Sequence, residues 1–188
     1  MSYNELQHQT DRQLVERVLQ GDRHAFGAII TGTERLVAQI VQRMVFRAED
    51  RKDLVQDIYL KVFRHLGGFR FDAKLSTWIA NIAYHTCINF LEKKKILLTG
   101  ENYEHIPETG AAEQSLQGKE LSGIINAAID ELPPVYKTIF VLFHKEELSI
   151  SEICNITSMP EGTVKSHLFR ARKQLKQIIL LRHKKDSL

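Results

Sequence analysis

The chain has 188 residues, of which 43% are hydrophobic and 26% are charged, and its formal net charge is +3. The composition excludes a disordered chain, and the absence of any run of 18 apolar residues argues against a membrane-spanning segment. Residues 1–20 are polar and lack the basic start and apolar stretch of a secretory signal, so we expect a cytoplasmic protein.

Apolar side chains recur at helical spacing along most of the chain. Residues 36–45, 53–66 and 121–132 each place them mainly at i, i+3 and i+4, as on one buried helix face. Pro133 and Pro134 end the last of these segments and can open the next helix. No segment alternates with period two for long enough to predict a strand, so the expected fold class is all-α. Four long stretches also lack glycine: residues 33–66, 69–99, 124–161 and 163–188.

The segment 96–118 differs from its surroundings, because it holds three glycines, one proline, four glutamates and no lysine or arginine. It is predicted to be a flexible acidic linker. Two small helical domains, at residues 11–95 and 119–182, are the simplest interpretation. A surface loop within one domain is the alternative, although structureless loops of this length are uncommon in compact domains.

Cysteine and histidine are sparse in patterns that would bind metal. Cys87 and Cys154 lie in apolar helical segments, so we expect both to be small buried residues, without a disulfide or a thiolate zinc site. His85 and Cys87 are the nearest approach to a ligand cluster, and they lie on an apolar helical stripe. The sequence also has no phosphate-binding glycine loop, nucleophile elbow or His-Glu metal motif, so neither a cofactor nor an enzymatic activity is expected.

The segment from residue 149 to 175 has the pattern of a helix-turn-helix. Ser149 can cap a short helix, with Glu152 completing a capping box. A polar turn follows at residues 157–160, and a second helix is predicted over 161–175. The residues predicted to face inward from that helix are Val164, Leu168, Ala171 and Leu175.

The opposite face of the second helix is basic. Residues 162–185 contain eight lysines and arginines and no acid, which would attract a polyanion. Side chains of this kind can contact base edges, thymine methyl groups and phosphates, although a solvated basic helix is the plainer alternative. The candidate DNA-binding residues are Lys165, Ser166, Phe169, Arg170 and Lys173.

The string SISEICNITSMPEGTVKSHLFRARKQL (149–175) resembles the -35-reading unit of the extracytoplasmic-function (ECF) sigma factors of bacteria, and by itself also resembles LuxR-type regulators. Three further strings resemble successive segments of the same sigma family, and their order favours that family over the LuxR type: LVERVLQGDRHAF (14–26), DLVQDIYLKVFRHL (53–66) and FRFDAKLSTWIANIA (69–83). The resemblance implies a non-catalytic subunit that binds core RNA polymerase and promoter DNA. Members of the family are commonly held inactive by an anti-sigma factor, which is often membrane-anchored, so such a partner is expected here. A stand-alone LuxR-type regulator is the alternative.

Site residues follow from the resemblance. The helix at 53–66 would bind polymerase through Asp53, Gln56 and Asp57, although acids at a helix N-terminus are also favoured by the helix dipole. The segment at 69–83 would capture a base of the -10 element, and its Trp78 also has the spacing of a core residue. The candidate -10 residues are Arg70, Phe71, Asp72, Lys74, Ser76 and Trp78, with Ser76 as a helix cap.

Several positions depart from the family pattern. Asn81 and Tyr84 occupy exposed positions where arginines are frequent, which bears on contacts with the -10 strand. Ser158 stands where a turn glycine is usual, and serine is less comfortable in a left-handed backbone. Thr33, with Gly32, interrupts the first long helix where bulkier residues are expected.

Overall fold

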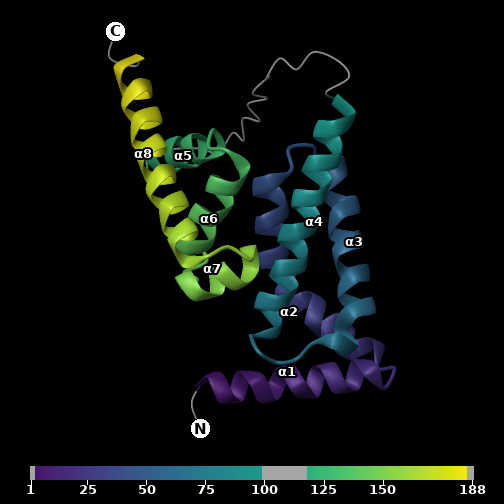
Figure 1. Cartoon of the computed structure of the whole chain (residues 1–188). Helices are drawn as coiled ribbons and strands as arrows, with labels where there is room; N and C mark the ends of the chain where they lie inside the picture. Colours follow the sequence, from purple (N-terminus) through teal and green to yellow (C-terminus); the bar gives the residue numbers. More distant parts are fainter. Residues whose placement is uncertain (1–2, 99–117, 186–188) are drawn as a thin grey trace.

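The computed structural model describes residues 3–98 and 118–185 (Figure 1). Within these ranges the chain is helical and contains no strand, which confirms the all-α prediction. Most of the predicted linker, residues 99–117, lies outside the described residues. Of its remaining residues, 96–98 end one helix and residue 118 begins the next. The elements are α1 (Tyr3–Leu19), α2 (Arg23–Met44), α3 (Ala48–His65), the 3-10 turn η1 (Leu66–Gly68), α4 (Leu75–Leu98), α5 (Gly118–Asp130), α6 (Pro134–His144), α7 (Ile150–Thr157) and α8 (Glu161–Lys185).

Helices α1–α4 form the first bundle, in which α2, α3 and α4 pack together and α1 lies across one end (Figure 1). Asp22 starts α2, because its carboxylate accepts hydrogen bonds from the backbone N–H groups of His24 (2.9 Å) and Ala25 (3.1 Å). The apolar stripes predicted for α2 and α3 supply much of the core, and α1 and α4 add to it. Its fully buried members include Val37, Ile40, Met44, Ile58, Val62, Leu66, Ile79 and Ala83.

Thr33 does not interrupt α2, which runs unbroken past it, so the expectation of an interruption there was wrong. The Thr33 side chain is buried, and its hydroxyl lies 2.7 Å from the carbonyl oxygen of Ile29 and 3.0 Å from the hydroxyl of Tyr59. A threonine here gives the buried Tyr59 hydroxyl a partner that an apolar residue could not. Burial raises the pKa of Tyr59, although the Thr33 hydroxyl partly opposes that change.

Helices α5–α8 form the second bundle. As predicted, Pro133 and Pro134 separate two helices: α5 ends at Asp130 and Pro134 begins α6. The periodicity overestimated the buried face of α5, because Ile124 and Ile125 are exposed. The buried apolar residues of this bundle include Ala128, Leu132, Ile139, Leu142, Ile153, Ile156, Val164, Leu168 and Ala171.

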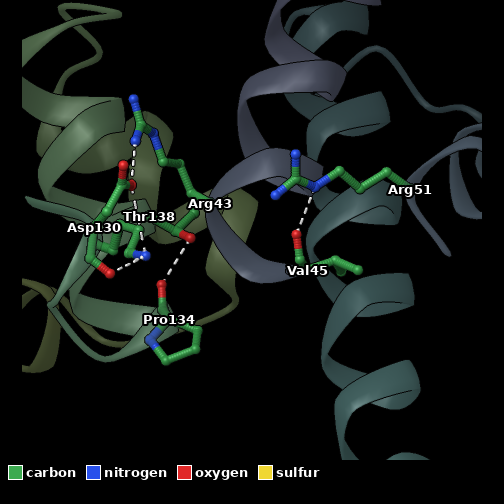
Figure 2. Close-up of polar contacts among 7 residues, drawn as sticks. Arg43, Val45, Arg51, Asp130, Pro134 and Thr138 are labelled. Atoms are coloured by element: carbon green, nitrogen blue, oxygen red, sulfur yellow. Dashed lines mark hydrogen bonds and ion pairs between the residues drawn. The ribbon is translucent and has the colours of Figure 1, made fainter. Parts of the chain in front are cut away.

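The two bundles pack directly on each other, with α7 against α4 and α6 against α2 (Figure 1). Buried apolar side chains from both bundles join in one continuous cluster. Ion pairs add to this contact, and Figure 2 shows one of them, in which Arg43 of α2 points toward Asp130 at the end of α5, with Nη1 2.6 Å from the carboxylate. We call this packing of the two bundles against each other, through α4 with α7 and α2 with α6, the closed arrangement.

Candidate nucleic-acid interface

The helix-turn-helix predicted at residues 149–175 is present as α7 and α8. Ser149 and Glu152 form a reciprocal capping box: the Glu152 N–H donates to Ser149 Oγ (3.2 Å), and the Ser149 N–H donates to the Glu152 carboxylate (2.9 Å). Ser158 then ends α7 in the left-handed conformation, with φ of 56°. The turn thus keeps the geometry that glycine usually provides, at the cost of mild backbone strain.

The face of α8 directed away from the bundle carries the five candidate DNA-binding residues. All five are exposed, Phe169 by 68%, and they surround one shallow hollow. Of the residues predicted to face inward, Val164, Leu168 and Ala171 are buried, whereas Leu175 is half-buried. The five side chains around the hollow are Lys165, Ser166, Phe169, Arg170 and Lys173.

Two of these cations have neighbours that hold them in place. Lys165 Nζ lies 2.5 Å from the carboxylate of Glu161, one turn earlier on the exposed surface of α8. Arg170 reaches the Tyr136 hydroxyl of α6, with Nη1 and the oxygen 3.4 Å apart. Arg170 thereby stands at the junction of α8 and α6 with most of its guanidinium donors still free to meet a base edge or a phosphate.

The loop before α4 holds the candidate -10 residues. Arg70 and Asp72 are exposed, whereas Phe71 and Trp78 are half-buried around Phe69, with ring centroids 4.6 Å and 5.2 Å from that of Phe69. Phe71 has a positive φ of 61°, and the guanidinium of Arg12 from α1 lies 5.0 Å from its ring centroid. The aromatic cluster closes one end of the core while keeping part of two rings accessible.

The start of α4 differs from the prediction. Ser76 is not the helix cap, because α4 begins one residue earlier at Leu75. The Leu75 N–H donates instead to the carboxylate of Asp11 (2.9 Å), which is buried on α1. Asp11 fixes the end of the candidate loop from a position 64 residues away in the sequence, and no local pattern could have revealed it.

Just before α4 and along it, polar side chains that were expected to face DNA meet the second bundle instead. Lys74 Nζ lies 2.8 Å from the carboxylate of Glu152 on α7, and Asn81 donates hydrogen bonds to the end of the same helix. Tyr84 is fully buried, contrary to its expected place on the exposed face, and burial raises its pKa to about 12. Of the two positions that departed from the family pattern on this helix, only Asn81 reaches the surface of α4.

The candidate polymerase-binding residues lie along α3. Asp53 and Gln56 are exposed, and Asp57 is half-buried with its carboxylate 2.8 Å from Lys61 Nζ. The periodicity also assigned Leu60 and Phe63 to the buried face, which is wrong: they are 54% and 55% exposed. The exposed strip of α3 therefore combines carboxylates with uncovered apolar groups, a composition common at protein interfaces.

One buried lysine was not predicted from the sequence. Lys137 of α6 is only 3% exposed, and its ammonium donates to the carbonyl oxygen of Asp130 (2.6 Å) and lies 5.3 Å from the ring centroid of Phe46. Burial lowers its pKa, the Asp130 carboxylate opposes that change, and Arg43 reinforces it. Figure 2 shows the surroundings of this site, where Arg43 approaches Asp130 and Thr138 donates to the Pro134 carbonyl.

Metal-ligating side chains do not converge anywhere in the two described ranges. Cys87 is fully buried, and desolvation raises the pKa of its thiol to about 12. Cys154 is half-buried, so the expectation of full burial holds for Cys87 alone. Among the described helices, none is long and apolar enough to cross a membrane.

Two family models match the chain. The model for Sigma-70 region 2 matches residues 29–96, and the model for Sigma-70 region 4 matches residues 122–175. The first covers most of the first bundle, and the second covers α5–α7 and the first half of α8.

Several characterised proteins are similar to the chain along nearly its whole length. The ECF RNA polymerase sigma-E factor of Haemophilus influenzae is 35% identical over 181 residues, which are 90% of this chain and 95% of that protein. The ECF RNA polymerase sigma-E factor of Escherichia coli K12 is 33% identical over 177 residues, 88% and 92% of the two chains. The RNA polymerase sigma-H factor of Pseudomonas aeruginosa is 30% identical, covering 90% and 94%.

Two solved structures share the fold. CnrH, in complex with the cytosolic domain of CnrY, superposes with a TM-score of 0.65 at 18% identity, covering 90% of this chain and 97% of that one. RpoE of Bartonella quintana, in complex with the anti-sigma factor NepR, also gives a TM-score of 0.65 at 19% identity, covering 82% and 96%.

Proposed function

Because the chain belongs to the ECF family of RNA polymerase sigma factors, we propose a division of labour between its two bundles in promoter recognition. Residues 11–95 bind core polymerase and read and open the -10 element, residues 119–182 read the -35 element, and residues 96–118 connect them. The observation that carries this proposal is the exposed basic face of α8, set on a capped helix-turn-helix. A stand-alone LuxR-type regulator does not account for the region 2 match at residues 29–96.

Recognition of the -35 element is assigned to Arg170, Lys165, Ser166, Phe169 and Lys173. Arg170 is the base reader we favour, because a guanidinium can donate two hydrogen bonds to a guanine edge. Lys165 is assigned to both base and phosphate contact, whereas Lys173 supplies a phosphate contact, which positions the helix without reading sequence. The exposed ring of Phe169 suits contact with a thymine methyl group.

Substituting Arg170 tests this assignment. Arg170→Ala is expected to lower the preference for the cognate -35 element over a mismatched one by about 1–3 kcal/mol. Arg172→Ala is the matched control, since that guanidinium turns the other way on α8, with its Nη2 3.2 Å from His144 Nε2. The measurement is competition binding of holoenzyme to cognate and mismatched promoters at fixed salt. Unchanged discrimination by Arg170→Ala would remove it from the readout.

For the -10 element, the proposal places an unpaired base against the loop that precedes α4. The half-buried ring of Phe71 offers a stacking surface, and Arg70, Asp72 and Lys74 offer charges and hydrogen-bonding groups near it. Trp78 packs beside the Phe69 ring and is half-buried, so it is assigned a packing role together with contact through its accessible part. Ser76 belongs to the first turn of α4 and stays a candidate contact.

Polymerase binding is assigned to α3, where Asp53, Gln56 and Asp57 lie beside the exposed Leu60 and Phe63. Carboxylates suit an arginine-bearing partner, and the apolar pair gives the contact buried area.

Charge reversal tests the docking surface. Asp57→Lys is expected to weaken binding to core polymerase, because it opposes a basic partner and repels the neighbouring Lys61. Glu16→Lys, at an exposed position of α1, is the control for the change in net charge. Affinity is measured by titrating labelled chain with core enzyme, and helix content by circular dichroism. Equal affinity of the two variants would contradict this docking surface.

A protein with this role forms no covalent bond itself and works where the chromosome is, so we propose a non-enzymatic, cytoplasmic factor without a cofactor. We also propose control by an anti-sigma factor, supported by the relative crystallised with NepR. Such a partner would compete with core polymerase for the chain, and a partner bound together with the polymerase would contradict this mode of control.

A further inference from the structure

The contact between α4 and α7 is built around one side-chain amide. Asn81 Nδ2 lies 2.8 Å from the carbonyl oxygen of Asn155, 3.0 Å from that of Ile156 and 3.1 Å from the Ser158 hydroxyl. Carbonyl groups in the last turn of a helix lack partners within the helix. Asn81 therefore caps the C-terminal end of α7 from the other bundle.

The Ser158 hydroxyl has a second partner on α4. His85 Nε2 lies 3.1 Å from Ser158 Oγ, one helical turn beyond Asn81. Serine holds the left-handed position that glycine would occupy with less strain, but unlike glycine it brings a hydroxyl to this point. Asn81 and Ser158 are two of the positions that depart from the family pattern, and they meet each other across the domain contact.

Charges flank this contact. Lys74 and Glu152 form an ion pair beyond one end of it, and Arg35 of α2 lies 3.0 Å from the carboxylate of Glu146 after α6. Lys74 is also a candidate -10 contact. In the closed arrangement its ammonium is already engaged by the region 4 domain, so DNA and α7 would compete for the same face of α4.

The closed arrangement is incompatible with reading a whole promoter. The -10 and -35 elements are separated by about 25 base pairs, or about 85 Å at about 3.4 Å per base pair. A compact chain of this length has a radius of gyration of only about 16 Å. The two bundles must separate before one chain can reach both elements.

We propose that Asn81, His85 and Ser158 form a latch that holds the free chain closed, with α7 covering the DNA-reading face of α4 until core polymerase separates the bundles. The part played by DNA and polymerase rests on the proposed function. The latch itself concerns the free chain and stands on the three hydrogen-bonded residues. They join the two domains without burying a charge, so the contact can open and re-form.

The test measures the separation of the bundles by pulsed electron paramagnetic resonance. One spin label is placed at Arg64→Cys on α3 and the other at Gln177→Cys on α8, both exposed positions. The background is Cys154→Ala, and the buried Cys87 thiol is left in place. The parent chain is expected to give a single short distance.

Two variants open the latch by different routes. Asn81→Asp replaces the donating amide with a carboxylate that faces three oxygens, and Ser158→Gly removes the shared hydroxyl while relieving the backbone strain. Each is expected to raise the ratio of long to short distances about tenfold. Asn89→Asp, the same change at an exposed position of α4, is the control. Distances in both variants that match the parent and Asn89→Asp would overturn the latch.

Adding core polymerase tests opening by polymerase separately from the latch in the free chain. Binding with a shift of the parent chain to long distances supports opening by polymerase. Binding with no shift overturns that step, and failure to bind contradicts the proposed function instead. Ser158→Gly also distinguishes opening of the latch from unfolding. Glycine suits the left-handed turn, so this variant should keep or raise the melting temperature even though its bundles separate.

Discussion

The buried carboxylate of Asp11 gives the clearest quantitative prediction. It accepts the Leu75 N–H at 2.9 Å and so caps α4 from α1. Losing a helix cap costs about 0.5–2 kcal/mol, and a hydrogen bond to a charged group contributes about 1.5–3 kcal/mol. Since Asp11 is only 5% exposed, water cannot easily replace it. Asp11→Ala is therefore expected to cost about 2 kcal/mol, where these ranges overlap.

Urea and thermal unfolding of the whole chain measure this cost. For a chain of this size, about 2 kcal/mol corresponds to a fall in Tm of about 4–8 °C. Asp11→Asn retains an acceptor oxygen without the charge and should lose about half as much. Gln13→Ala, at an exposed position of α1, should stay within about 0.5 kcal/mol of the parent chain.

The same variant has a functional consequence, because Asp11 fixes the residue that follows the candidate -10 loop. Asp11→Ala is expected to weaken promoter opening more than -35 binding, since α8 lies in the other bundle. A loss of stability no greater than that of Gln13→Ala would refute the capping argument. Equal losses in promoter opening and -35 binding would refute the link to the loop.

Two further predictions concern buried polar groups. Thr33→Val and Tyr59→Phe each remove one hydroxyl of the Thr33–Tyr59 pair, so each should lower the free energy of unfolding by about 1 kcal/mol. The double variant should lose less than the sum of the two, because neither hydroxyl is left without its partner. Additive losses in urea unfolding would contradict the pairing. Glu152 is partly desolvated, yet hydrogen bonds from Lys74 and Ser149 lower its pKa below 4.5, so its stabilising effect is complete above pH 4.5 and is lost as the pH falls through the lowered pKa. Glu152→Gln can keep the capping box, so its stability difference from the parent should shrink on acidification; a constant difference from pH 6 to pH 3 would contradict this.

Features set by neighbouring residues could be predicted from the sequence. The capping box at Ser149 and Glu152 depends on residues three apart, and the break at Pro133 and Pro134 depends on proline geometry. The inward and outward faces of α8 follow from helical periodicity, because the helix packs on the bundle along one stripe. Local rules therefore sufficed for the helix-turn-helix.

Features set by distant partners could not be predicted. Periodicity places Leu60 and Phe63 on an apolar face but does not tell which part of that face meets a neighbour, and the structure leaves both exposed. Tyr84 was expected outside because a related sequence position is exposed, yet it is buried in this chain. Lys137 gave no signal at all, since a lysine between apolar residues reads as a solvated side chain.

The continuous apolar cluster beneath the domain contact has a consequence for the chain when it has no partner. Separating the bundles would bring apolar surface of α4 and α7 into water, and exposed apolar patches favour aggregation. The closed arrangement therefore keeps the free chain from aggregating, because each domain covers the apolar surface of the other. A partner that separates the bundles, such as polymerase, must therefore cover this apolar surface itself as they move apart.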